Sequence, residues 1–189
     1  MTRERPEKDG AAELGARIRE FARARAYPDS LLERWLGMQA RDAGALWRVA
    51  SALRLGPNHW RDVAEWAEEI ALREGGTVAD VLERAEVREA WEGRPARNEA
   101  LRSLRAVLRK LRFPRLAACE ERIRAALRDL GLPPHVRVRL PEYLRDAELT
   151  LEIRASDAAA LSRAVRSLEA ALADGRWSKV FESLRELPE

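Results

Sequence analysis

The stretch best suited to specific chemistry is LRSLRAVLRKLRFPR at residues 101–115, which is basic throughout. It holds six cations and no acidic residue: Arg102, Arg105, Arg109, Lys110, Arg112 and Arg115. On a helix of about 3.6 residues per turn, the four arginines up to residue 112 fall within an arc of about 80°, and the apolar residues between them fall in a separate arc of about 120°. A guanidinium group is a planar, permanently charged fork that binds phosphate oxygens or carboxylates. The pattern therefore predicts an amphipathic helix that packs by one face and presents a row of arginines on another.

Two interpretations of this row stay open. Contact with the phosphates of a nucleic acid would give affinity that does not depend on base sequence. Alternatively, the row could dock on carboxylates of an acidic partner protein or of a second copy of the chain. The chain also supplies carboxylates of its own, because residues 61–100 hold 6 basic and 11 acidic residues. A row that is solvated or paired within the fold is therefore expected at least as strongly as a binding row.

A helix-turn-helix is a weaker candidate for nucleic-acid binding. Residues 45–72 read as two helices joined by a short turn, and Asn58, His59 and Arg61 would lie near the start of the second one, where base contacts are expected. The same helix carries acidic residues such as Asp62 and Glu65, which phosphates would repel. Ordinary packing of two helices is the favoured interpretation.

Residues typical of metal sites and of enzymes are sparse. The chain has one cysteine, Cys119, which we expect to be a small buried residue, and two widely separated histidines, His59 and His135. There is no glycine-rich phosphate loop, zinc-protease motif or nucleophile elbow. We therefore expect a protein that is not an enzyme and that has no cofactor, no metal and no catalytic residue.

The composition, 46% hydrophobic and 35% charged, is that of a soluble helical protein. No apolar run approaches the roughly 18 residues needed to cross a bilayer, and residues 1–10 lack the apolar stretch of a signal peptide. We expect a cytoplasmic protein with no membrane partner.

Helical periodicity and capping signals predict most of the elements. Asp29 is placed to cap a helix, Gly56 suits a helix C-terminus, and Thr77 with Asp80 forms a capping-box pattern. Pro114 should end the basic helix at Phe113. The segment 91–98 is expected to be a loop leading into the basic helix. The other predicted helices span approximately residues 11–26, 29–36, 41–53, 57–74, 77–82, 116–130, 157–173 and 176–184.

The period changes from 3.6 to 2 after residues 131–134, which predicts two strands at 135–140 and 148–154. The connection PEYLRD is short enough for an antiparallel hairpin. The helix at 157–173, capped by Ser156, should cover the apolar face of that hairpin. The charged strand residues could form an exposed basic face or cross-strand pairs such as Arg139 with Glu152, and the hairpin edge could pair with another subunit. The C-terminal unit is thus a candidate dimerisation or docking module.

The fold expected from these elements is mainly α, a helical body with a small C-terminal α+β unit. We expect a flexible tail at 1–10, a helical domain at 11–130 and a ββαα unit at 131–187.

Three segments together resemble the region after the DNA-binding helices of ParB-like proteins, a family linked to chromosome partition: LRLGPNHWRDVAEWAEEIALREGG, LRSLRAVLRKLRFPRLAACEE and LGLPPHVRVRLPEYLRDAELTLEI. The resemblance covers roughly residues 53–172. The arginine-rich nucleotide-binding motif of that family has no counterpart here, so the resemblance implies neither nucleotide hydrolysis nor clamp formation nor nuclease activity. It favours DNA over RNA, as an accessory or assembly module. The leading hypothesis is a DNA-associated protein that contacts phosphates through the six cations of residues 101–115, and the alternative is a protein-interaction or dimerisation module.

Overall fold

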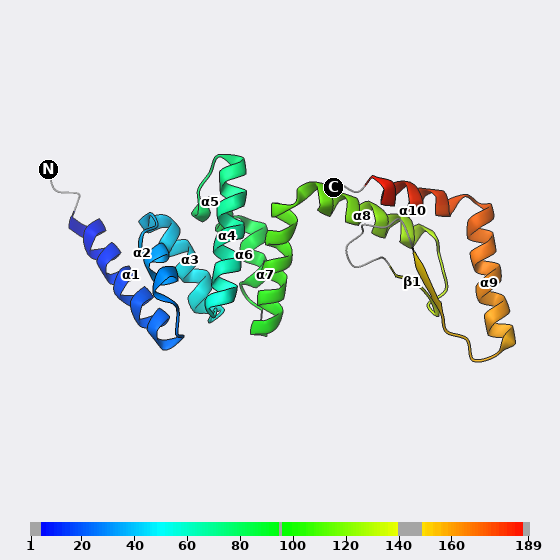
Figure 1. Cartoon of the computed structure of the whole chain (residues 1–189), viewed down its shortest axis with the longest axis horizontal. Coiled ribbons are helices and arrows are strands. Elements are labelled where there is room, and N and C mark those ends of the chain that lie inside the picture. Colours follow the sequence, from blue (N-terminus) through cyan, green and yellow to red (C-terminus); the bar gives the residue numbers. More distant parts are fainter. Residues whose placement is uncertain (1–4, 95, 140–148, 187–189) are drawn as a thin grey trace. The chain divides into compact units, whose positions relative to one another are not determined.

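The computed structural model describes residues 5–94, 96–139 and 149–186, and its fold is mainly α, as expected (Figure 1). The chain divides into two compact units, which are described separately. Unit 1 is Met1–Arg112 and unit 2 is Phe113–Glu189.

Seven helices make up the described part of unit 1. They are α1 (Arg5–Ala24), α2 (Asp29–Leu36), α3 (Ala40–Ala52), α4 (Pro57–Glu74), α5 (Val78–Leu82), α6 (Ala85–Trp91) and α7 (Arg97–Arg112). The predicted capping box is present at the start of α5, where the Thr77 side chain accepts from the Asp80 amide and the Asp80 carboxylate accepts from the Thr77 amide. Gly75 ends α4 in the left-handed conformation, at φ 70°.

Aromatic rings form the centre of the unit 1 core. Trp35 of α2 and Trp60 of α4 are fully buried, with ring centroids 5.0 Å apart. Tyr27 packs beside both rings and donates a hydrogen bond from its hydroxyl to the Leu55 carbonyl at 3.1 Å. Large rings that are spread along the sequence therefore meet in one place, which fixes α2 against α4.

Unit 2 contains three helices and a hairpin in its described residues. The elements are α8 (Pro114–Asp129), β1 (Val136–Arg139), β2 (Thr150–Ile153), α9 (Ala158–Ala173) and α10 (Arg176–Arg185). The strands are antiparallel, as expected, with Val138 opposite Leu151. The expected connection PEYLRD falls outside the described residues. Cys119 of α8 is buried, and its thiol donates to the Ser183 carbonyl of α10.

Several boundaries differ from the sequence prediction. Residues 5–10 belong to α1 and not to a tail, and α8 belongs to unit 2, so the division falls after Arg112 and not near residue 130. Asp29 is the first residue of α2 and caps nothing with its side chain, because Pro28 occupies the N-cap position. Gly56, at φ −87°, precedes α4, and the positive φ that ends α3 falls on Arg54, at 46°. Asp157 caps α9 in place of Ser156.

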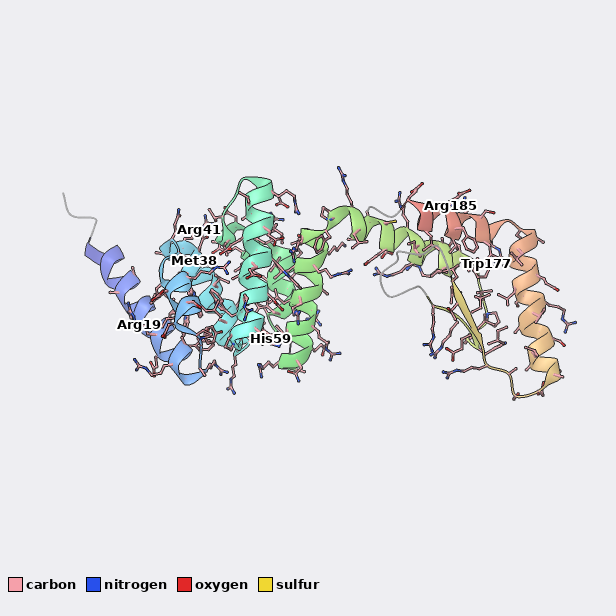
Figure 2. All side chains as sticks on the ribbon, viewed as in Figure 1. Arg19, Met38, Arg41, His59, Trp177 and Arg185 are labelled. Carbon is pink, nitrogen blue, oxygen red and sulfur yellow. The ribbon has the colours of Figure 1, made fainter. Side chains whose placement is uncertain are left out.

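The hairpin packs against a core to which α8, α9 and α10 all contribute, with Ala171 and Leu168 coming from α9. The core joins α8 to α10 through large side chains such as Ile123 and Trp177, and Val138 and Leu149 pack against it. Figure 2 labels Trp177 on α10. The inward side of α9 consists largely of alanine, including the fully buried Ala164. Because alanine reaches less far than the side chains of α8 and α10, those two helices provide most of the buried surface.

Candidate nucleic-acid interface

The basic helix predicted from the sequence is α7, and its apolar arc is buried as expected. Leu101 is 7% exposed, and Leu104 and Leu108 are fully buried in the unit 1 core. These leucines hold α7 against α4 and α6. The packing of α7 therefore fixes the backbone positions from which the arginine side chains extend.

Two of the four arginines at positions 102, 105, 109 and 112 are engaged by acidic residues of α4. Arg105 forms an ion pair with Asp62 at 2.9 Å, and Arg112 holds both carboxylate oxygens of Glu69 at 2.5 and 2.8 Å. The indole of Trp66 lies between these pairs, with the guanidinium carbons of Arg105 and Arg112 at 5.4 and 5.8 Å from its ring. Partner numbers rise together along both helices, so α4 and α7 run parallel where they meet. The contact between α4 and α7 therefore includes two ion pairs with one aromatic ring between them.

The other side of α4 is neutralised in the same way. Arg34 of α2 reaches Glu65 at 3.4 Å and Glu68 at 2.5 Å. The acidic segment noticed in the sequence is thus paired with arginines from the helices on both sides of it. This outcome corresponds to the interpretation in which the charge reversal is resolved within one fold.

The other cations of residues 101–115 have different surroundings. Arg102 is exposed, and its guanidinium makes a local 3.4 Å hydrogen bond to the Asn98 carbonyl one turn earlier on α7. Lys110 is exposed and has no ion pair within the described part of the chain. Arg109 is exposed but is itself engaged within the protein. Arg115 lies on α8 in unit 2. Among the cations of residues 101–115 that lie in unit 1, Arg102 and Lys110 therefore remain open to an external anion.

The structure gives a role to arginines that the sequence analysis did not single out. Arg73 donates to the Leu111 and Arg112 carbonyls, both at 2.7 Å, and so caps the C-terminus of α7. Arg97 caps α3 through the Leu53 carbonyl at 2.6 Å, and Arg176 caps α8 from α10. A cation at a helix C-terminus also offsets the helix dipole. Sequence spacing holds no signal for these contacts, because each joins separate helices.

Two of the three residues proposed for a helix-turn-helix bond to each other. Arg61 donates to the Asn58 side chain at 2.9 Å, and His59 near the start of α4 (Figure 2) is half-buried, with Nδ1 shielded from solvent. Four carboxylates of this helix pair with Arg34, Arg105 and Arg112, and Glu74 at its end pairs with Arg73 and Arg84. The arrangement is that of packed helices.

Shifted pKa values report structural ion pairs and, at Tyr27, burial. Hydrogen bonds from Arg41 and Arg48 of α3 hold the pKa of the Glu83 carboxyl below its ordinary value. Burial raises the pKa of the Tyr27 hydroxyl. Over residues 5–94, 96–139 and 149–186, no three His, Cys, Asp or Glu side chains are grouped to hold a metal ion, and no helix is long and apolar enough to span a membrane.

Comparisons with protein-family models, with curated proteins and with solved structures give no match for this chain. The resemblance to ParB-like proteins therefore stays a prediction.

Proposed function

We propose that this chain is a non-enzymatic protein that associates with nucleic acid, DNA in preference to RNA, through phosphate contacts from the outer part of α7. The observation that carries the proposal is the separation of the basic row into two parts. Arg105 and Arg112 are committed to α4, while Arg102 and Lys110 are exposed without an acidic partner in the described residues.

The pairing within unit 1 supports this reading, because it removes the main electrostatic objection. Free carboxylates on α4 would repel a phosphate backbone. Asp62 and Glu69 are instead neutralised by guanidinium groups, so the field outside α7 is dominated by the cations that have no partner. Two phosphate contacts give modest affinity and carry no information about base sequence. Sequence specificity would therefore come from a partner or from another surface.

The test is the fluorescence anisotropy of labelled duplex DNA across a salt series. Replacing Arg102 and Lys110 by Glu should abolish binding. The matched control, Arg19→Glu with Arg23→Glu on α1, makes the same change in net charge at exposed cations elsewhere and should bind much as the natural chain does.

The alternative, an acidic protein partner, predicts the opposite selectivity. Poly-L-glutamate would then bind to the row while duplex DNA fails to bind even at low salt. That outcome, or equal loss in both double variants, would overturn the proposal.

A further inference from the structure

The helix α9 carries a wider apolar arc than its own unit covers. Leu161, Val165, Leu168 and Leu172 follow one another at intervals of four, three and four residues. Leu161 is 46% exposed, Val165 39% and Leu172 61%, whereas Leu168 packs partly against the unit 2 core. Figure 1 shows α9 (orange) at an edge of unit 2, leading into α10 (red). We call these four residues the α9 stripe.

The stripe is centred away from the side of α9 that faces its own core, and Leu168 lies at the edge of the stripe nearest that side. At about 100° per residue, the stripe spans an arc of about 60°, and the fully buried Ala164 and Ala171 lie about 70–90° to one side of its centre. Spacing of this kind is that of a helix–helix seam in a coiled coil. Three exposed large apolar residues on one side of a helix, Leu161, Val165 and Leu172, favour a surface that another protein covers.

The order of residues in the stripe makes it complementary to itself. If two α9 helices run antiparallel about a two-fold axis between Arg166 and Ser167, Leu161 of one copy lies opposite Leu172 of the other, and Val165 lies opposite Leu168. Every position of the stripe then meets another apolar position. Such an isologous contact closes at two copies and leaves no open end for further growth.

Charge beside the stripe selects the direction. Arg166 and Glu169 lie on its solvent side, and neither forms an ion pair with another residue in the described ranges. In the antiparallel arrangement Arg166 of one copy lies about two residues, or about 3 Å, along the axis from Glu169 of the other, and the pair occurs twice. In a parallel arrangement the two-fold axis would run along the helices and place Arg166 of one copy and Glu169 of the other on opposite sides of the contact, so they could not pair.

We propose that the α9 stripe is the interface of a homodimer in which two α9 helices pack antiparallel, with reciprocal pairs between Arg166 and Glu169. The interface lies in unit 2 and involves none of the cations of α7. The inference therefore stands or falls independently of nucleic-acid binding.

The first test is the mass of the full chain in solution, measured by light scattering from about 1 to 100 µM. The natural chain should be dimeric toward the upper end of this range. Leu161→Glu and Val165→Glu should each raise the dimer Kd at least about tenfold. The control is Leu72→Glu on α4, because Leu72 is 86% exposed and lies in unit 1, and this variant should stay dimeric.

The second test is a charge reversal that also reports the direction. Arg166→Glu alone and Glu169→Arg alone should each weaken the dimer, and the two together should restore it, because each reversed charge again meets its opposite on the other copy. Circular dichroism checks that each variant folds, and Leu161→Gln with Val165→Gln repeats the first test with uncharged side chains. A natural chain that stays monomeric at the highest concentration overturns the proposal, as does a dimer that the stripe variants leave intact. A dimer weakened by the stripe variants but indifferent to the charge reversals overturns the antiparallel arrangement.

Discussion

Replacing Asp62 by Asn and Glu69 by Gln should turn the paired half of the α7 row into a phosphate-binding surface. In the natural chain these carboxylates hold Arg105 at 2.9 Å and Arg112 at 2.5 Å. The variant keeps similar side-chain shapes and leaves both guanidinium groups stacked near Trp66, so their positions should change little. Each guanidinium that newly neutralises a phosphate adds about −0.9 to the slope of log affinity against log salt, so two of them should steepen it by about 1.8.

The cost in stability should be small enough for the experiment to work. All four side chains are at least a quarter exposed, and exposed ion pairs contribute about 0.2–1 kcal/mol each. The assay is the anisotropy of labelled duplex DNA, with the slope fitted over a salt series. The matched control, Glu13→Gln with Glu92→Gln, removes two paired carboxylates elsewhere in unit 1, on α1 and just after α6, and raises the net charge equally. An unchanged slope in the Asp62/Glu69 variant, or an equal change in the control, would refute the idea that α4 masks half of a phosphate-binding row.

Three further predictions concern the stability of unit 1. Gly75→Ala should lower the free energy of unfolding by roughly 1–2 kcal/mol in urea titration, because φ is 70° there while an added Cβ would meet no atom within 4 Å; an unchanged midpoint would contradict the left-handed cap. Leu104→Ala should cost about 2–5 kcal/mol in the same assay, because Leu104 is fully buried between α7 and the core, and a loss below about 1 kcal/mol would place α7 at the surface. Arg41 and Arg48 hold the pKa of the Glu83 carboxyl below its ordinary value of 4.5. The ionised carboxylate therefore contributes to the free energy of unfolding above about pH 4.5, and this contribution is lost as the pH falls through the lowered pKa. Glu83→Gln should reduce the free energy of unfolding at pH 7 and make less difference at about pH 3.

All the helices except α6 could be predicted from the sequence, because their signals are local. The capping box at Thr77 and Asp80 and the proline that starts α8 act within one turn, so spacing alone places these helix ends. The sequence predicts the end of α3 to within one residue but not the left-handed residue that follows it, because that residue is Arg54 and not glycine. The carbonyl of Arg54 accepts hydrogen bonds from Arg97 and Arg25, which belong to or follow other helices. Contacts of this range hold the turn in place and leave no trace in local spacing.

The candidate surfaces show the same division between local and distant causes. The apolar and basic arcs of α7 follow from periodicity, but which arginines remain open depends on α4, more than 30 residues earlier in the chain. Periodicity likewise predicts an apolar arc on α9, yet it does not say which part of the arc the chain covers for itself. The small inward residues Ala164 and Ala171 are the physical reason that the arc extends beyond unit 2, since they hold α9 against its neighbours while leaving Leu161 and Leu172 in solvent. A helix that packs on its own core through alanine keeps its larger apolar residues available, and on α9 their spacing is suited to a second copy of the same helix.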